Sequence, residues 1–325
     1  MTYPSAGFPS DLLRAGGDPA LDAKFDVCIV SWRTRELLRA CLRTVVGQPE
    51  VARVIVVDNA SGDGTVEMVG AEFPSVHLIA NAENRGYAAA NNQAIGAGNA
   101  PFVLLLNPDT ALMPGALTVM LREMTEGSGI GAVAPQLVLP DGTIQQSCRS
   151  FPEPAAVLCD GLGLSRLFPR SESLGRYRMT YWDHTSRREV EQPMASALAL
   201  RRAALEEVGL FDKSFPLYFN DADLCYRLRQ ARWRIIFQPT ARVLHHHGSS
   251  TAQVRVQAVL ESHRSLIRFY RKHYRGKVSF AGYWAVVLMA VLTVYPRAAF
   301  AWLRKPLPLT PPRARGGGRG GVGSA

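Results

Sequence analysis

The sequence predicts an α/β fold with a mostly parallel sheet, followed by a membrane-associated helical segment. Between residues 25 and 125, short apolar strand patterns alternate with helical patterns, as they do in parallel sheets covered by helices. One of these strands stops at Asn107-Pro108-Asp109, and open α/β sheets bind ligands at the carboxyl ends of their strands. Residues 278–296 carry no charge, and at about 1.5 Å per residue they are long enough for a membrane helix.

The first half of the chain contains four strand–helix pairs. Apolar runs predict strands at Phe25–Ser31 and at residues 53–58, 76–80 and 102–106. Helical spacing of apolar side chains predicts helices at residues 36–46, 65–73, 87–97 and 114–124. Because crossovers in parallel sheets are right-handed, the functional loops are expected on one edge.

After about residue 130 the pattern is less regular. A turn signal at residues 140–143 predicts a hairpin between residues 131–139 and 143–146, whereas residues 150–190 are irregular and rich in aromatic side chains and Arg. The remaining elements are expected to be a strand at 195–200, helices at 201–208 and 221–232, short strands at 234–238 and 242–246, and a basic helix at 263–274.

Positive charge is concentrated near the C-terminal end. Of 37 Lys and Arg residues, 12 lie in residues 264–325, which contain no Asp or Glu, so residues 1–263 hold 25 (37 − 12) basic and 27 acidic residues. This distribution argues against a nucleic-acid-binding catalytic domain and favours a basic appendage that contacts an anionic surface. Basic residues flank 278–296 on both sides, so a spanning helix, an in-plane helix and a buried helix of a soluble protein all stay open.

The termini and the cysteines indicate a cytoplasmic catalytic domain. The first 24 residues lack the apolar core of a secretory signal peptide. The five cysteines form no Cys-x-x-Cys pair and are expected to be reduced, with most of them buried. Residues 306–325 are rich in Pro, Arg and Gly and are predicted to be a disordered tail.

Two strand ends carry residues suited to a nucleotide site. Proline ends the strand before Asp109, and this sequence fits either a plain turn or a site for Mg²⁺ or Mn²⁺, since hard cations bind carboxylates and substrate phosphates. Asp58 ends another strand, where it could accept a hydrogen bond from a nucleotide base or simply begin a strand–turn–helix connection. Arg85 could pair with a phosphate or be a solvated surface charge. No glycine-rich dinucleotide or phosphate loop follows the first strand.

Four motifs together resemble the inverting family 2 glycosyltransferases of the GT-A fold, and most closely their rhamnosyltransferase-like branch. They lie at residues 57–65 (Val-Asp-Asn-Ala-Ser-Gly-Asp-Gly-Thr), 84–91 (Asn-Arg-Gly-Tyr-Ala-Ala-Ala-Asn), 106–109 (Leu-Asn-Pro-Asp) and 211–224. The likeness spans about residues 25–251 and implies one GT-A domain with a nucleotide-sugar-binding half (25–125) and an acceptor half (126–251). Residues 1–24 are then an N-terminal extension, and 252–305 a basic helix with the apolar membrane-associated segment.

The resemblance also implies roles for single residues. Asp109 matches the second acid of the family's Asp-x-Asp metal motif, with His245 as the second metal-side residue and His247 as its alternative. Asp221, in Asn220-Asp221-Ala222-Asp223, matches the catalytic base, although an N-cap role would also suit an acid at a helix start. Nucleotide contacts are implied at Asp58, which would bind the base, and at Ser31, Asn59, Asn84, Arg85 and Asn107; acceptor contacts are implied at Asn220, Asp223 and Phe219.

The implied function is metal-dependent, inverting transfer of a sugar from dTDP-rhamnose or a UDP-sugar to a hydroxyl of a glycan or lipid-linked glycan. This would serve surface-polysaccharide or cell-wall synthesis at the cytoplasmic face of the cell membrane. A nucleotidyltransferase is an alternative, but residues 32–35 do not supply its glycine-rich, Arg-containing loop. A catalytically inactive membrane adaptor with the same fold is a second alternative, and the retained acids argue against it. The sequence indicates neither the sugar nor the oligomeric state.

Overall fold

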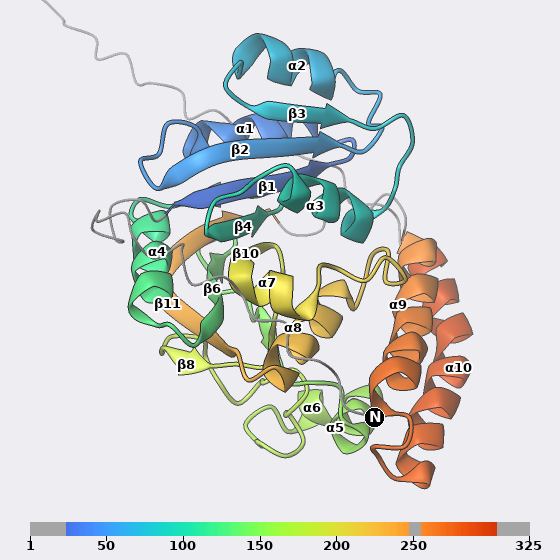
Figure 1. The fold of residues 1–325 in the computed structure, drawn as a ribbon. Helices are drawn as coiled ribbons and strands as arrows, with labels where there is room; N and C mark the ends of the chain where they lie inside the picture. Colours follow the sequence, from blue (N-terminus) through green and yellow to red (C-terminus); the bar gives the residue numbers. More distant parts are fainter. Residues whose placement is uncertain (1–23, 247–254, 304–325) are drawn as a thin grey trace, which may run out of the picture.

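A nine-stranded mixed sheet forms the centre of the molecule (Figure 1). The computed structural model describes residues 24–246 and 255–303 of the 325-residue chain. The strand order is β3-β2-β1-β4-β10-β6-β11-β5, β8 pairs with β11, and β7 and β9 form a separate pair. The strands are β1 Phe25–Ser31, β2 Val51–Asp58, β3 His77–Ala80, β4 Phe102–Leu106, β5 Thr110–Leu112, β6 Ile130–Val138, β7 Cys148–Arg149, β8 Arg188–Glu189, β9 Gln192–Pro193, β10 Ala197–Arg201 and β11 Arg234–His245.

Parallel pairing dominates this sheet. β3, β2, β1 and β4 are parallel neighbours, and β6 and β11 also pair in parallel. β10 runs antiparallel between β4 and β6, so it joins the first half of the chain to the second in the middle of the sheet. The predicted α/β fold with a mostly parallel sheet is confirmed.

Two hydrophobic layers cover the two faces of the sheet, because successive strand residues point to opposite sides. One layer packs α1, α2 and α4 against residues such as Val27 and Leu104, and the other packs α3, α7 and α8 against residues such as Cys28 and Leu105. These helices are α1 Arg35–Val45, α2 Thr65–Glu72, α3 Tyr87–Gly96, α4 Ala116–Glu126, α7 Arg202–Val208 and α8 Asn220–Gln230.

The second half of the chain departs from the prediction in several elements. The two short strands predicted at 234–238 and 242–246 are one strand, β11, with an irregular register between Gln238 and Arg242 that accommodates Pro239. β5 was not predicted, because its three residues are too few to show the alternation of apolar and polar side chains that marks a strand. The turn at 140–143 is confirmed, but the second arm of its hairpin is a single bridge between Val138 and Ile144. Residues 150–190 contain two short helices, α5 Pro154–Gly161 and α6 Leu164–Leu167.

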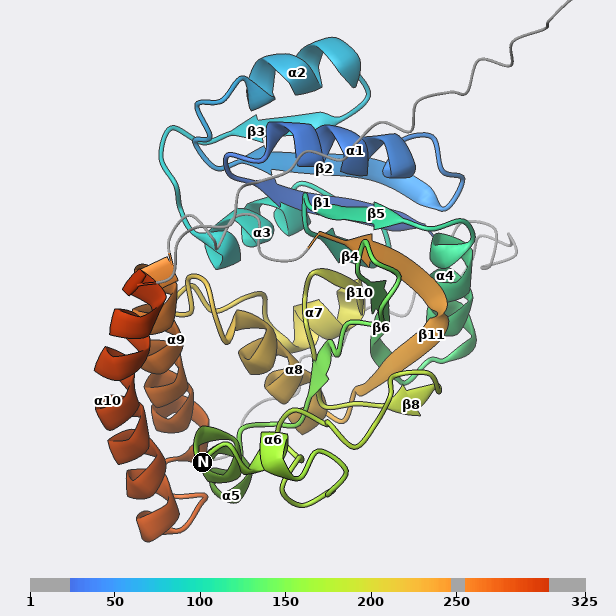
Figure 2. The same ribbon diagram turned by 180° about the vertical axis from the view of Figure 1, so that it is seen from behind.

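Two C-terminal helices lie side by side along one flank of the molecule, next to α5 (Figures 1 and 2). α9 (Arg255–Phe269) begins earlier than the predicted basic helix, and it continues into a π-helical turn at Tyr270–Tyr274. α10 (Phe280–Leu303) contains the uncharged segment and runs back along α9. The contact between α5 and α10 is close, since a Cβ on Gly161 would overlap with the Met289 sulfur.

α10 presents two different faces. Val286 and Ala290 are buried against the protein, whereas the opposite side exposes large apolar side chains along the whole helix. Within the described residues, it is the one helix long and apolar enough to cross a membrane. Its exposed side chains are Phe280, Trp284, Leu288, Val291, Leu292, Tyr295, Phe300, Trp302 and Leu303.

Some predictions fall on residues that the structure does not describe. They are the N-terminal extension apart from Lys24, the disordered tail at 306–325, and the alternative metal residue His247. All five cysteines are described; they are unpaired, and every one except Cys159 is buried, as predicted.

Candidate active site

The carboxyl ends of β1 and β2 bring the predicted nucleotide residues together. Ser31 and Asp58 are register partners at the ends of these strands, and the Asn59 N–H donates to the Ser31 carbonyl at 2.8 Å. Asp58 is buried, and its Oδ2 accepts the Ser61 N–H at 3.1 Å. Its Oδ1 is buried with no hydrogen-bond partner in the described structure. Since such an acceptor is costly to leave unpaired, this atom is suited to receive an N–H from a ligand.

Asn59 and Asn84 tie two loops of this edge to each other. The Asn59 amide donates to Asn84 Oδ1 at 2.8 Å, and Asn59 Oδ1 accepts the Arg85 backbone N–H at 3.0 Å. Asn59 Oδ1 also accepts from the Asn81 amide at 3.2 Å. The structure therefore brings Asn59, Asn84 and Arg85 together, with the Asn side chains bonded to protein and Arg85 exposed at the surface.

The Asn107-Pro108-Asp109 segment is a turn, and this turn holds an acid against a histidine. The Thr110 N–H and hydroxyl both donate to the Asn107 carbonyl, at 3.2 and 2.6 Å. β5 then pairs with the end of β11, so that Asp109 Oδ1 lies 3.5 Å from His245 Nε2. The two interpretations of this sequence, a plain turn and a segment that positions Asp109 for a cation, are therefore compatible.

The Asp109–His245 pair fits a divalent cation that also binds substrate phosphates. Gln145 Oε1 lies 2.7 Å from His245 Nδ1, and when Nδ1 donates a hydrogen bond to it, the lone pair of the neutral ring is on Nε2, which faces Asp109. Within the described ranges, no group of three or more His, Cys, Asp or Glu side chains could hold a metal by itself. Mg²⁺ typically binds one or two protein ligands and completes its coordination with phosphates and water, which suits this small donor set.

Asp221 lies in the first turn of α8, after Phe219 in left-handed backbone conformation (φ 62°). Its Oδ1 accepts the Ala222 N–H at 2.8 Å, and the Ala195 backbone N–H lies close enough to stabilise the charged carboxylate. Burial raises the pKa of Asp221, while these hydrogen bonds and the positive charge of Arg149 act in the opposite direction. A carboxylate with a raised pKa is a stronger base than an ordinary Asp.

Residues 195 and 196 lie between the Asn107-Pro108-Asp109 turn and the Asp221 carboxylate. The Asn107 N–H donates to the Ser196 carbonyl at 2.8 Å, and the Asn107 amide lies 3.3 Å from the Ser196 hydroxyl. Ala195, the residue before Ser196, lies close enough for its N–H to stabilise the Asp221 carboxylate, and its carbonyl accepts the Tyr87 hydroxyl at 3.1 Å. Asp221 and the segment that begins at Asn107 therefore belong to one site at one edge of the sheet.

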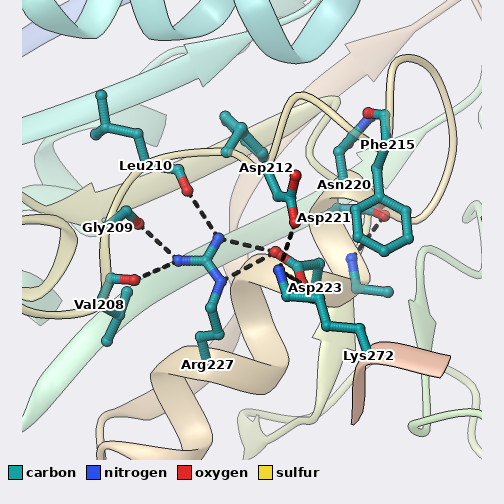
Figure 3. A network of polar contacts seen from close by, with 12 residues as sticks. Val208, Gly209, Leu210, Asp212, Phe215, Asn220, Asp221, Asp223, Arg227 and Lys272 are labelled. Carbon is teal, nitrogen blue, oxygen red and sulfur yellow. Dashed lines mark hydrogen bonds and ion pairs between the residues drawn. The ribbon is translucent and has the colours of Figure 1, made fainter. Parts of the chain in front are cut away.

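The predicted acceptor residues around Asp221 make contacts within the protein (Figure 3). The Asn220 amide donates to the Leu217 carbonyl at 2.9 Å, and Asn220 is buried. Asp223 is fully buried (0% exposed) among cationic side chains. Phe219 is half-buried and packs against Phe269, with ring centroids 5.7 Å apart.

Comparison with known proteins places the chain in a family. Residues 26–149 match the model of glycosyl transferase family 2. Over 236 residues the chain is 31% identical to the N-acetylglucosaminyl-diphospho-decaprenol L-rhamnosyltransferase of Mycobacterium tuberculosis, and the match covers 69% of this chain and 76% of that protein. The chain belongs to glycosyltransferase family 2.

Further relatives of this glycosyltransferase support the assignment. The low-salt glycan biosynthesis hexosyltransferase Agl10 of Haloferax volcanii is 23% identical over 208 residues, which cover 63% of this chain and 61% of that protein. A mannosyltransferase from Pyrobaculum calidifontis, solved in complex with GDP-Man and Mn²⁺, shares the fold with a TM-score of 0.53. That match has 18% identity and covers 88% of this chain and 76% of the other. The GT-A fold expected from the motifs is thus confirmed.

Sequence reasoning missed three residues of the candidate site. Gln145 orients His245, Ser196 bonds to Asn107, and Arg149 on β7 contributes positive charge near Asp221. Gln145 and Arg149 follow the turn at 140–143, in a stretch without clear periodicity. Their role depends on pairing between distant segments, such as β7 with β9, which no local pattern reveals.

Proposed function

We propose that this glycosyltransferase moves a sugar from a nucleotide-diphosphate donor to a hydroxyl of a lipid-linked glycan, with inversion at the anomeric carbon. The observation that carries this proposal is the assembly of Asp109, His245 and Asp221 at one sheet edge, bridged by residues 195 and 196. The rhamnosyltransferase relative, named for a decaprenyl-diphosphate-linked sugar, supports dTDP-rhamnose as the donor and a lipid-linked acceptor. A UDP-sugar is the alternative donor.

In the proposed step, Asp221 accepts the proton of the acceptor hydroxyl while that oxygen forms a bond to the anomeric carbon. The bond from this carbon to the diphosphate oxygen breaks at the same time, and its electron pair leaves with the nucleoside diphosphate. The raised pKa of Asp221 favours proton transfer to it, the Ala222 N–H holds the carboxylate in place, and the nearby Ala195 N–H stabilises its charged form.

We infer that Mg²⁺ or Mn²⁺ serves as the cofactor and that Asp109 and His245 hold it. When bound, the cation would supply positive charge to the departing diphosphate. Asp58 would accept a hydrogen bond from the base through its unpaired Oδ1, at the other end of the nucleotide. The donor then lies across the ends of β2, β1 and β4, which assigns residues 25–125 to the nucleotide-sugar half of the domain and residues 126–251 to the acceptor half.

A panel of nucleotide sugars tests the proposal. Purified full-length enzyme in detergent is incubated with radiolabelled dTDP-rhamnose and UDP-sugars, with or without a synthetic polyprenyl-diphosphate-linked N-acetylglucosamine. We expect one donor to give a lipid-linked product whose new glycosidic bond has the opposite anomeric configuration to the donor. Retention of configuration in the product would contradict the single-displacement mechanism.

We further propose that α10 lies in the plane of the membrane at its cytoplasmic face. At about 36 Å for 24 residues, the helix is long enough to span a bilayer, but its inner side packs along α9 and α5. In-plane insertion would bury the exposed apolar side without separating α10 from the protein. Nearby basic residues such as Arg275 and Lys277 would then contact anionic lipid headgroups.

Replacing Trp284, Leu288 and Leu292 with Ser is expected to release the enzyme from vesicles that contain anionic lipid. Each fully buried large apolar side chain contributes about 1.5–3 kcal/mol, so vesicle affinity should fall more than about 100-fold. Vesicle flotation measures the bound fraction. Alkaline carbonate extraction distinguishes the two orientations, because an in-plane helix is released and a spanning helix is retained.

A further inference from the structure

Asp223 connects α8, the helix that carries Asp221, to the C-terminal segment formed by α9, the π-helical turn and α10. Asp223 Oδ1 lies 2.6 Å from Lys272 Nζ and 2.7 Å from His273 Nε2, and both residues belong to the π-helical turn after α9. Asp223 Oδ2 accepts from Arg227 Nε at 2.9 Å, one turn along α8 (Figure 3). The carboxylate is 0% exposed, so its charge is balanced entirely by these protein groups.

The same cations also fix the loop before α8. Lys272 Nζ lies 2.6 Å from Asp212 Oδ2, and the Arg227 guanidinium donates to the carbonyls of Val208, Gly209 and Leu210 (Figure 3). Burial acts to raise the pKa of Asp212, but the Lys272 and Ser214 hydrogen bonds prevail and lower it to about 2. Burial likewise opposes a lowered pKa at Asp223, where the His273 hydrogen bond and neighbouring cations prevail. Both acids are therefore charged at neutral pH.

The geometry of α8 relates this ionic cluster to the base. At about 100° per residue, Asp221 and Asp223 point to nearly opposite sides of the helix. Asp221 faces the sheet edge through Ala195, and Asp223 faces the C-terminal segment. The His273 ring is enclosed by Tyr226 and Phe269, at centroid distances of 4.5 and 4.7 Å, so the π-helical turn is packed as well as ion-paired against α8.

We propose that Lys272 and His273 are positioning residues: from the C-terminal segment, they hold the first turn of α8 so that Asp221 meets the acceptor hydroxyl. This inference rests on the proposed role of Asp221 as the base. It makes the segment that carries the membrane helix a structural part of the acceptor site. Lys272 and His273 lie outside the region that matches the family model, residues 26–149.

Lys272→Met and His273→Phe test the proposal in the full-length enzyme, with dTDP-rhamnose and the polyprenyl-diphosphate acceptor. We expect kcat to fall about 10- to 100-fold, as small displacements of catalytic groups can cost a factor of this order. The dissociation constant of dTDP should stay within twofold, because Asp58, the proposed base-binding residue, has no hydrogen bond or ion pair with Asp223, Lys272 or His273 in the described structure. Lys272→Arg should recover most of the activity, since it retains the charge. The matched control is Arg271→Met, which removes an exposed cation from the same turn.

The acid limb of the pH–kcat profile distinguishes a displaced Asp221 from a general loss of protein stability. If α8 loosens, Asp221 becomes more solvated, and the limb should move to lower pH. Met124→Ala, a buried substitution on α4 at the other face of the sheet, should lower the melting temperature without moving this limb. The proposal is overturned if Lys272→Met and His273→Phe match Arg271→Met in kcat, or if their limb does not move. Persistent activity of Asp221→Asn in the same assay would instead disprove the base assignment.

Discussion

Asp221→Asn is expected to reduce kcat by about 10²–10⁴-fold, the usual contribution of a general base, while the enzyme still binds nucleotide. The amide retains the shape of the carboxylate but cannot accept the proton from the acceptor hydroxyl. Turnover is measured with the donor that the panel identifies, and dTDP or UDP binding by calorimetry. Glu206→Gln, an exposed carboxylate on α7, is the matched control and should leave both unchanged.

The same substitution is expected to stabilise the fold at neutral pH. Because burial raises the pKa of Asp221, folding favours its neutral form. This stabilisation is fully present below the unfolded pKa, about 3.9, and it is lost as the pH rises through the higher folded pKa. Asn carries no charge to desolvate, so the melting temperature should rise at pH 7. A simple N-cap role predicts the reverse, namely a destabilised protein that remains active.

Activity of the unmodified enzyme should follow the same titration. Only the ionised Asp221 can accept a proton, so kcat/KM should fall as the pH drops through its folded pKa. The acid limb is therefore expected above the ordinary Asp value of about 3.9 and should disappear from the residual activity of Asp221→Asn. A limb at or below 3.9 would contradict the assignment of Asp221 as a base with a raised pKa.

Asp109→Ala is expected to remove the metal dependence of nucleotide binding and to lower kcat/KM by at least about 10³-fold. The unmodified enzyme should bind dTDP or UDP more tightly with Mn²⁺ than with EDTA, since the cation joins the protein to the diphosphate. In the variant the two calorimetric affinities should converge. His245→Gln is expected to lower kcat/KM less, because the charged ligand Asp109 is still present in this variant. Equal nucleotide binding by the unmodified enzyme in Mn²⁺ and in EDTA would refute the metal role.

The elements that the sequence predicted correctly share one property, which is local periodicity. β1, β2 and β4 are mostly apolar runs, and α1 and α4 carry apolar side chains at helical spacing, so each can be recognised without its neighbours. β11 is different, because Pro239 breaks the local pattern while pairing with β6 and β5 continues the strand on both sides. Such tertiary pairing overrides local signals.

In the candidate site, too, residues in local sequence motifs could be predicted, whereas contacts between distant segments could not. Asp58 and Asp109 follow strand patterns, so their placement at the edge of the sheet followed from the topology, whereas Asp221 was assigned from the family resemblance alone. The contacts of Asp223 could not be predicted, because His273 lies 50 residues farther along the chain, on a helix with no motif. Gln145 likewise reaches His245 across 100 residues. Interactions of this kind are set by how the chain folds back on itself.

Because β10 lies between β4 and β6 in the sheet, truncated fragments of this protein that lack β10 are expected to be unstable. Residues 26–149, the part that matches the family model, contain β4 but not its hydrogen-bonding partner β10. A fragment that ended at residue 149 would expose the unpaired backbone of β4, and would also leave β6 without either neighbour. Bare apolar strand edges pair with other molecules and aggregate. Residues 26–149 are therefore not expected to fold as an independent unit, and truncated proteins need to retain the chain through β11.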